Sequence, residues 1–192
     1  ASPKVTPVMR NDHDKMVKDI HEALVKCNAH DGMTVSFHHH FREGDLVVCM
    51  VMEEIHKMGF KNITLSASSL GKAHDALVPM IEDGTIVNIE SSGVRGKIGS
   101  HGKLKGLATM RSHGGRVRAI ETGETHVDIA FIGAPSCDEY GNCSGMGGKT
   151  NCGVLSYAYV DAEMADYVVA VTDCLVDYPN YPAEINQTKV DY

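Results

Sequence analysis

A chain of 192 residues with 43% hydrophobic and 22% charged side chains has the composition of a folded globular protein, not of a disordered one. Its formal net charge of −7 disfavours nucleic acid as a partner, because a polyanion binds a basic surface. No stretch is long and apolar enough to span a membrane, and the opening segment ASPKVTPVMRNDHDK lacks the apolar core of a signal peptide. The six cysteines form no CxxC pair and several have apolar neighbours, so we expect reduced thiols in a cytoplasmic protein.

Helices and strands are predicted to alternate along the chain. Residues 1–12 should form a loose arm, and residues 13–192 a single domain. Apolar residues at helical spacing predict a helix over 13–28. Charges that suit a helix dipole predict one over 43–58, and a cap at Ser68 or Ser69 predicts one that runs to about 82. Strands are predicted over 33–38, 62–67, 85–90, 127–133 and 167–172. This order predicts an α/β layered domain with a mostly parallel sheet, in which ligands bind at the carboxyl ends of the strands.

The loop after the first predicted strand carries His38, His39, His40 and Arg42. Three imidazoles and a guanidinium beside a predicted helix start favour a polycarboxylate or a phosphate as ligand. A purely structural histidine cluster and a metal site are the alternatives, and the metal site is weakened because no second ligand pair stands at a convincing spacing.

Two further loops combine glycines with cationic side chains. In Ser91–Gly99, the glycines Gly93 and Gly96 allow the backbone to approach a ligand while Arg95 supplies charge; a plain glycine-rich turn is the alternative. The next loop contains Arg111, His113, Gly114, Gly115 and Arg116, and two arginines that bracket His-Gly-Gly favour contact with a carboxylate or a phosphate.

A fourth loop, over residues 133–142, follows a buried strand, and Asp138 with Gly141-Asn142 is equally consistent with a turn and with a site. The spacing of Cys137, Cys143 and Cys152 matches no strong metal or cluster pattern. Cys137 as a nucleophile has little support, because nothing in the sequence indicates a lowered pKa.

The strings SFHHHFREGD, SSGVRGKIG, RSHGGRVRAIETGE and HVDIAFIGAPSCDEYGN closely resemble, in the correct order, the α chain of citrate lyase. The resemblance covers about residue 31 to about residue 185 and implies the α/β fold shared by CoA-transferases and ribose-phosphate isomerases. It implies a citrate CoA-transferase, in which citrate displaces acetate from a thioester on an acyl-carrier subunit and a citryl-lyase β subunit then cleaves the product. It further implies an oligomeric, cytoplasmic complex that serves citrate fermentation. The CoA thioester or acyl-carrier prosthetic group would be substrate, with no covalently bound cofactor and no metal on the α chain.

Proteins of that family are more than twice as long and have two similar halves, and this chain resembles only the amino-terminal half. The nucleophilic glutamate of related CoA-transferases lies in the other half, and neither Glu43, Glu121 nor Glu139 matches its motif, so the catalytic residues stay unassigned. We expect the carboxyl-terminal half to be a partner of this one.

This half is then expected to hold citrate and to stabilise the thioester oxyanion. The cationic candidates for citrate are His38, His39, His40, Arg42, Arg95, Arg111, His113 and Arg116, and the N–H donors for the oxyanion are Gly114, Gly115, Gly133 and Ala134. The alternatives are a non-catalytic module that binds CoA or an acyl carrier, a sugar-phosphate isomerase and a metal-binding module.

Overall fold

The computed structural model describes residues 14–38, 46–101 and 103–192, so the predicted arm over 1–12 lies outside it. Within these residues, six strands form one sheet in the order β4-β3-β2-β1-β5-β8. Every neighbouring pair in it is parallel, which confirms the predicted α/β fold. The strands are β1 (Thr34–Phe37), β2 (Ile63–Ala67), β3 (Ile86–Ser91), β4 (Ala108–Met110), β5 (Ile129–Gly133) and β8 (Tyr167–Val171).

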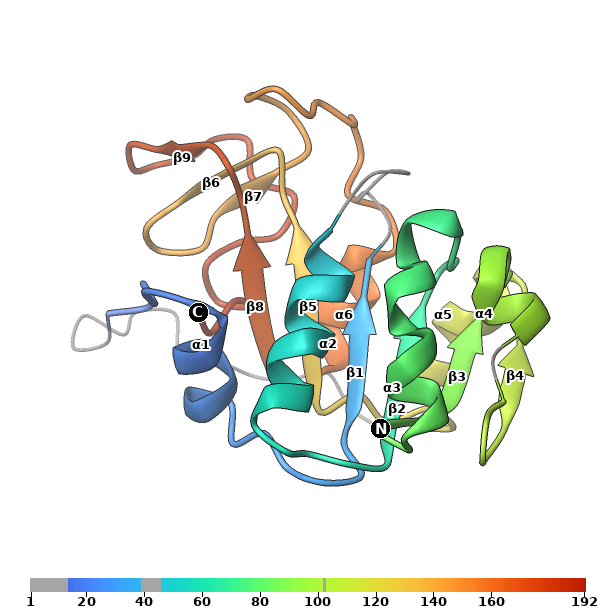
Figure 1. The fold of residues 1–192 in the computed structure, drawn as a ribbon. Coiled ribbons are helices and arrows are strands. Elements are labelled where there is room, and N and C mark those ends of the chain that lie inside the picture. Colours follow the sequence, from blue (N-terminus) through green and yellow to red (C-terminus); the bar gives the residue numbers. More distant parts are fainter. Residues whose placement is uncertain (1–13, 39–45, 102) are drawn as a thin grey trace.

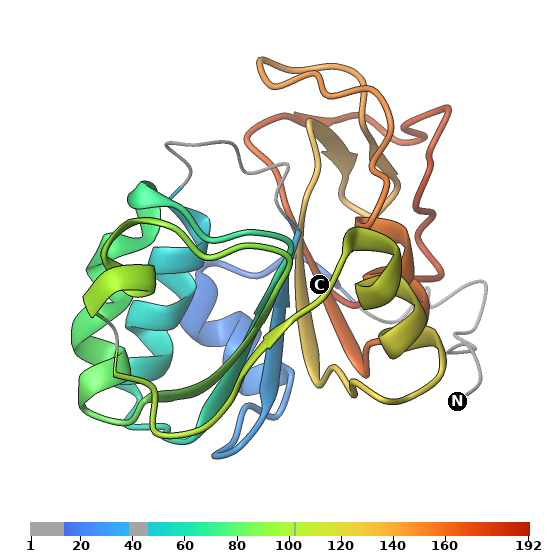
Figure 2. The same cartoon turned by 90° about the vertical axis from the view of Figure 1, so that its right-hand side faces the viewer.

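Helices cover both faces of this sheet, as Figures 1 and 2 show. One face carries α1 (Ile20–Lys26), α2 (Val47–Lys57), the 3-10 helix η1 (Lys72–Leu77), α3 (Val78–Glu82) and α4 (Gly96–His101). The other face carries α5 (His113–Glu121) and α6 (Ala158–Met164). Apolar side chains therefore form two cores, one on each side of the sheet.

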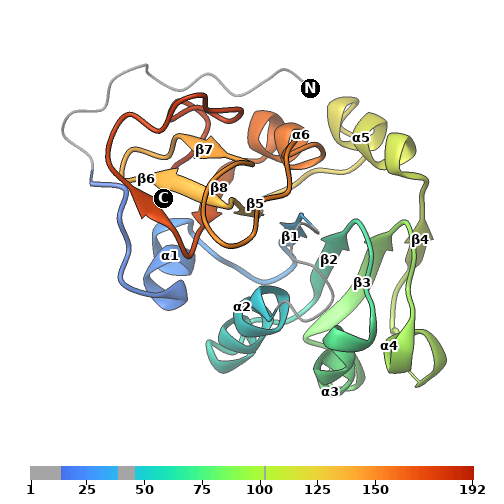
Figure 3. The same cartoon turned by 90° about the horizontal axis from the view of Figure 1, so that it is seen from above.

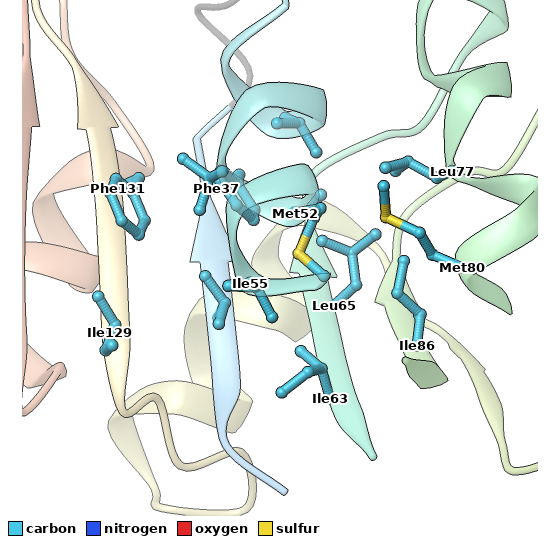
Figure 4. Packing of buried hydrophobic residues seen from close by; sticks show 14 of the residues in the cluster. Phe37, Met52, Ile55, Ile63, Leu65, Leu77, Met80, Ile86, Ile129 and Phe131 are labelled. Carbon is cyan, nitrogen blue, oxygen red and sulfur yellow. The ribbon is translucent and has the colours of Figure 1, made fainter. Parts of the chain in front are cut away.

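The larger core lies between the sheet and the first group of helices (Figure 4). In α2 the residues Val48, Val51, Met52 and Ile55 are buried, at the spacing that places them on one face of a helix. They pack in the same buried cluster as the strand residues, Phe37 among them. The ring of Phe37 stacks on that of Phe131 in the neighbouring strand, with centroids 5.7 Å apart.

A second sheet joins β7 (Cys143–Ser144), β6 (Ser136–Asp138) and β9 (Leu175–Val176) above the end of β5. Cys137 and Cys143 face each other across β6 and β7, with their sulfur atoms 3.3 Å apart. The hydrogen bond with Cys137, followed by burial, raises the pKa of Cys143, which disfavours its thiolate form.

Three predicted helices differ from the structure in extent. The helix over 13–28 is α1 alone, because Asp19 caps it by accepting from the N–H of Glu22. The helix over 43–58 is described from Val47, since residues 39–45 lie outside the described part. The helix expected up to residue 82 is two elements, a 3-10 helix and then α3, whose first turn holds Pro79. No described helix is long and apolar enough to cross a membrane.

Candidate functional site

The carboxyl ends of the parallel strands meet at one edge of the main sheet, and Figure 3 looks down onto it. At this edge β1 is followed by His38 and β2 by Ser68. In the same way, β3 is followed by Ser92 and β5 by Ala134. The chain after β4 enters α5 at the same edge. This is the place where open α/β sheets bind ligands.

The loops after β2 and β3 support each other. Leu70 donates its N–H to the carbonyl of Gly93 and accepts from the N–H of Arg95, each at 2.9 Å. The hydroxyl of Ser92 donates to the carbonyl of Ser68. The hydroxyl of Ser68 is buried and has no hydrogen-bond partner among the described residues.

Two histidines and a tyrosine line this edge above the sheet. The ring of His113, the first residue of α5, stacks on Tyr157 with centroids 5.0 Å apart. His38 is fully buried, and its ring lies 6.0 Å from the same tyrosine on the side of β1. The Nε2 atom of His113 lies 3.4 Å from the hydroxyl of Ser92. The structure therefore brings His38 and His113, both predicted site residues, to one aromatic ring.

Sequence reasoning missed Tyr157. It lies just before α6, far along the chain from both histidines, in a segment without strand periodicity or a recognisable motif. Only the folding of α6 against α5 brings its ring to His113.

The expected Arg-Ser-His-Gly-Gly-Arg loop is mostly the first turn of a helix. Ser112 caps α5 by accepting from the N–H of Gly115 at 3.0 Å, so Gly115 is not a donor for an oxyanion. Gly114 is exposed, and a Cβ atom placed there would meet no atom within 4 Å. Of the two glycines, Gly114 is therefore the one that presents open backbone in the first turn, where N–H groups lack partners within the helix.

Arg116 points into the protein rather than toward the edge of the sheet. It is 3% exposed, and its Nη2 atom lies 3.1 and 3.3 Å from the two carboxylate oxygens of Asp161, which is fully buried. The same nitrogen donates to the hydroxyls of Ser36 and Ser66 on β1 and β2. The sequence predicts that Arg116 contacts a ligand from a loop, whereas it lies in α5, which turns its side chain onto the sheet.

Burial raises the pKa of Asp161 above its ordinary value, and the neighbouring Arg116 offsets this only in part. The ion pair is therefore costly to bury and fixes α5 and α6 on β1 and β2 directly beneath the edge.

The remaining arginines and glycines have separate positions. Arg111 lies at the edge but pairs with Glu124, with Nη2 2.9 Å from Oε1. Arg95 is exposed at the start of α4. Gly96 has a φ of +71°, and a Cβ atom there would lie 2.4 Å from Oδ1 of Asp75, so the backbone conformation at this position requires glycine. Gly93 accepts from Leu70 in the loop described above.

The N–H of Ala134 is not free to bind an oxyanion. Gly133 is part of β5 and pairs with Val171, and the N–H of Ala134 donates to the carbonyl of Val171 at 2.9 Å. The expectation of an oxyanion donor at Ala134 is therefore wrong, because the neighbouring strand β8 already uses its N–H.

Asp138, which the sequence left open between structure and site, organises the second sheet. Its carboxylate accepts from the N–H groups of Tyr140, Asn142 and Asn180, and from the side-chain amide of Asn142. This one buried side chain holds two segments, the turn at Tyr140 to Asn142 and the loop at Asn180, which favours the structural interpretation.

His39, His40 and Arg42 lie outside the described residues. The described edge combines imidazole, hydroxyl and backbone N–H groups beneath which a guanidinium is buried, with Arg95 and Arg111 at its rim. The imidazoles, hydroxyls and N–H groups donate hydrogen bonds, so the edge suits an anionic ligand even though Arg111 and Arg116 have carboxylate partners.

Comparison with known proteins agrees with this geometry. A family model for the alpha subunit of citrate lyase matches residues 13–192. The chain is 48% identical to the citrate lyase alpha chain of Escherichia coli K12, over 99% of this chain and 38% of that protein. It is 47% identical to the one of Haemophilus influenzae, over 100% of this chain and 39% of that protein. The chain belongs to the citrate lyase alpha subunit family.

Solved structures extend the comparison. The citrate lyase alpha subunit of Streptococcus mutans in complex with citrate superposes with a TM-score of 0.94 at 52% identity, over 100% of this chain and 38% of that one. An acyl-CoA transferase of Escherichia coli O157:H7 has a TM-score of 0.65 at 15% identity, which shows a common fold alone. The chain thus spans less than two fifths of the citrate lyase relatives it matches.

Proposed function

We propose that this citrate lyase alpha chain carries the citrate-binding share of a citrate CoA-transferase, which exchanges acetate for citrate on a thioester. The observation that carries the proposal is the match of the whole chain to citrate lyase alpha chains, one of which superposes closely on it in complex with citrate. The anion-suited edge around His38 and His113 supports it independently.

In this proposal, His113 and the backbone of Gly114 at the start of α5 bind a carboxylate of citrate. The first turn of a helix favours negative charge. Tyr157 positions His113 by stacking on it, and the buried pair of Arg116 and Asp161 supports the start of α5 from below. Binding of citrate next to a thioester then places the two reactants together, and such placement lowers the barrier to exchange.

The substrate would be a CoA thioester or the prosthetic group of an acyl-carrier protein. The partners would be a citryl-lyase beta subunit and the remaining part of a longer alpha chain, within an oligomeric cytoplasmic complex. The catalytic nucleophile is left unassigned.

The test is acyl exchange between labelled citrate and acetyl-CoA, measured for this chain and for the longer product that contains it. We expect exchange in the longer protein and citrate binding, without turnover, in this chain. His113→Ala in the longer protein should raise the KM for citrate by about tenfold or more, which corresponds to the loss of one hydrogen bond to a charged group.

The matched control is His56→Gln on α2, a histidine paired with Asp83 away from the edge of the sheet. Exchange with unchanged KM in the His113→Ala protein would contradict the assignment of the site. Citrate or CoA binding without exchange in the longer protein would instead favour a non-catalytic binding module.

A further inference from the structure

A second cluster of ligating side chains lies at the opposite edge of the main sheet, where its strands begin. His126 and Asp128 lie in the three residues before β5, and Asp166 directly precedes β8. One ligand atom from each of the three lies within 4.8 Å of the others. His30, in the connection that leads to β1, brings its Nε2 atom to 3.6 Å from Oδ1 of Asp128.

The distances in this cluster fit the coordination sphere of a small divalent ion. Nε2 of His126 lies 2.8 Å from Oδ2 of Asp166 and 3.7 Å from Oδ1 of Asp128. Ligands about 2.1 Å from a tetrahedral zinc ion stand about 3.4 Å apart, so the observed separations lie on either side of the required value. The imidazoles of His30 and His126 are 59% and 63% exposed, so both rings have solvent on one side into which they can turn.

The backbone that carries these ligands is held by the sheet. The N–H of Thr34 donates to the second carboxylate oxygen of Asp128 at 2.7 Å, which orients the first toward the cluster. The N–H of Asp166 donates to the carbonyl of Val127, and the N–H of Tyr167 to that of Asp128, each at 3.0 Å. These contacts fix the starts of three neighbouring strands relative to one another.

The pair of His56 and Asp83 on the helical face shows the contrast. There the ammonium of Lys61 lies 3.0 Å from the carboxylate that the histidine also faces, so a cation already occupies the position that a metal would need. In the cluster before β5 and β8 the partners of the carboxylates are imidazoles, which can ligate a metal once they are neutral.

We propose that His126, Asp128 and Asp166, completed by His30, bind a divalent transition-metal ion such as Zn²⁺. Nitrogen and oxygen ligands in this combination favour Zn²⁺, Co²⁺ or Ni²⁺ over Mg²⁺ or Ca²⁺, which take oxygen ligands. The ion links the connection before β1 to the starts of β5 and β8, so its role is to stabilise this edge of the sheet. The proposal does not depend on the function proposed above.

The test is equilibrium dialysis of the chelator-treated protein against cobalt chloride, followed by absorption spectroscopy. We expect the wild type to bind Co²⁺ with visible bands of nitrogen and oxygen coordination and without a thiolate-to-cobalt charge-transfer band. The variant with His126→Gln and Asp166→Asn should lose this signal, with an affinity at least about tenfold weaker. Both side chains are largely exposed, whereas Asp128 accepts from the backbone and is left intact.

Two controls keep the result interpretable. His56→Gln should bind Co²⁺ like the wild type, and a variant with His39→Gln and His40→Gln removes binding by the histidine run. Thermal unfolding without metal checks that the cluster variant folds, and added Co²⁺ should raise the Tm of the wild type but not of that variant. Equal Co²⁺ binding and an equal shift in Tm in both proteins, or a spectrum with thiolate bands, would overturn the proposal.

Discussion

Removal of either member of the buried ion pair between Arg116 and Asp161 should destabilise the protein severely. Arg116 is 3% exposed and Asp161 is fully buried, so neither charge can return to water when its partner is lost. Breaking such a pair costs about 3–5 kcal/mol, because the remaining charge is buried without compensation. We therefore expect Arg116→Met and Asp161→Leu each to lower the free energy of unfolding by about this amount.

The double variant Arg116→Met with Asp161→Leu should be far less destabilised than the sum of the single variants. Apolar residues of similar volume often replace a buried ion pair at little or no cost. Arg111→Met is the matched control, because its pair with Glu124 is partly exposed and such pairs contribute about 0–1 kcal/mol. Urea unfolding of the four variants and the wild type gives the coupling energy directly.

The pH dependence of Arg116→Met provides a second readout. Burial already raises the pKa of Asp161 in the folded state, and the loss of the guanidinium should raise this pKa further. A carboxyl whose pKa is raised on folding makes the folded state less stable as the pH rises above the unfolded value. The loss of unfolding free energy in Arg116→Met, relative to the wild type, should therefore shrink as the pH falls toward 4, where an ordinary carboxyl titrates. Additive losses in the double variant, or a deficit independent of pH, would refute the reasoning.

Three further predictions concern single sites. Gly96→Ala should lower the free energy of unfolding by about 1–3 kcal/mol, because φ is positive at this residue and the added Cβ would meet Asp75. Gly93→Ala has open space at Cβ and should cost less than about 1 kcal/mol, so equal losses in urea unfolding would contradict this. Burial lowers the pKa of His74, so at a pH below about 6.5 the unfolded chain takes up a proton that the folded chain does not, and stability should fall. His74→Gln should flatten this pH dependence, and an unchanged slope would assign the dependence to other groups. Asp138→Ala should cost about 2–4 kcal/mol, because several buried donors lose their acceptor, and a loss within 0.5 kcal/mol would argue against its structural role.

The sequence could predict the main sheet because its strands are short apolar runs bounded by turn residues. The segments around Phe37, Leu65 and Phe131 are buried on both faces, and this leaves a continuous apolar signal that needs no tertiary information. The short strand β4 carries no such signal, since Ala108 and Met110 are exposed on the edge of the sheet. Its strand geometry comes from pairing with β3.

The candidate site was only partly predictable for a related reason. His38 and His113 stand beside recognisable strand ends or glycines, so local pattern alone indicates a ligand site. Arg116 shares the composition of that motif, but its direction depends on the helical phase of α5, and its partner Asp161 is far away in sequence. Composition shows which groups a segment offers, whereas their direction is set by packing against distant elements.

Three carboxylates near this edge already have hydrogen-bond or ion-pair partners, which matters for where the proposed exchange takes place. Exchange of acyl groups through an enzyme carboxylate requires that carboxylate to attack the thioester. Around the described edge, Asp161 is paired with Arg116, Glu124 is paired with Arg111, and Asp138 accepts from several backbone N–H groups. Each would have to give up these partners before it attacked. In the proposed division of labour, these three carboxylates support the edge, while its donors and cations bind citrate.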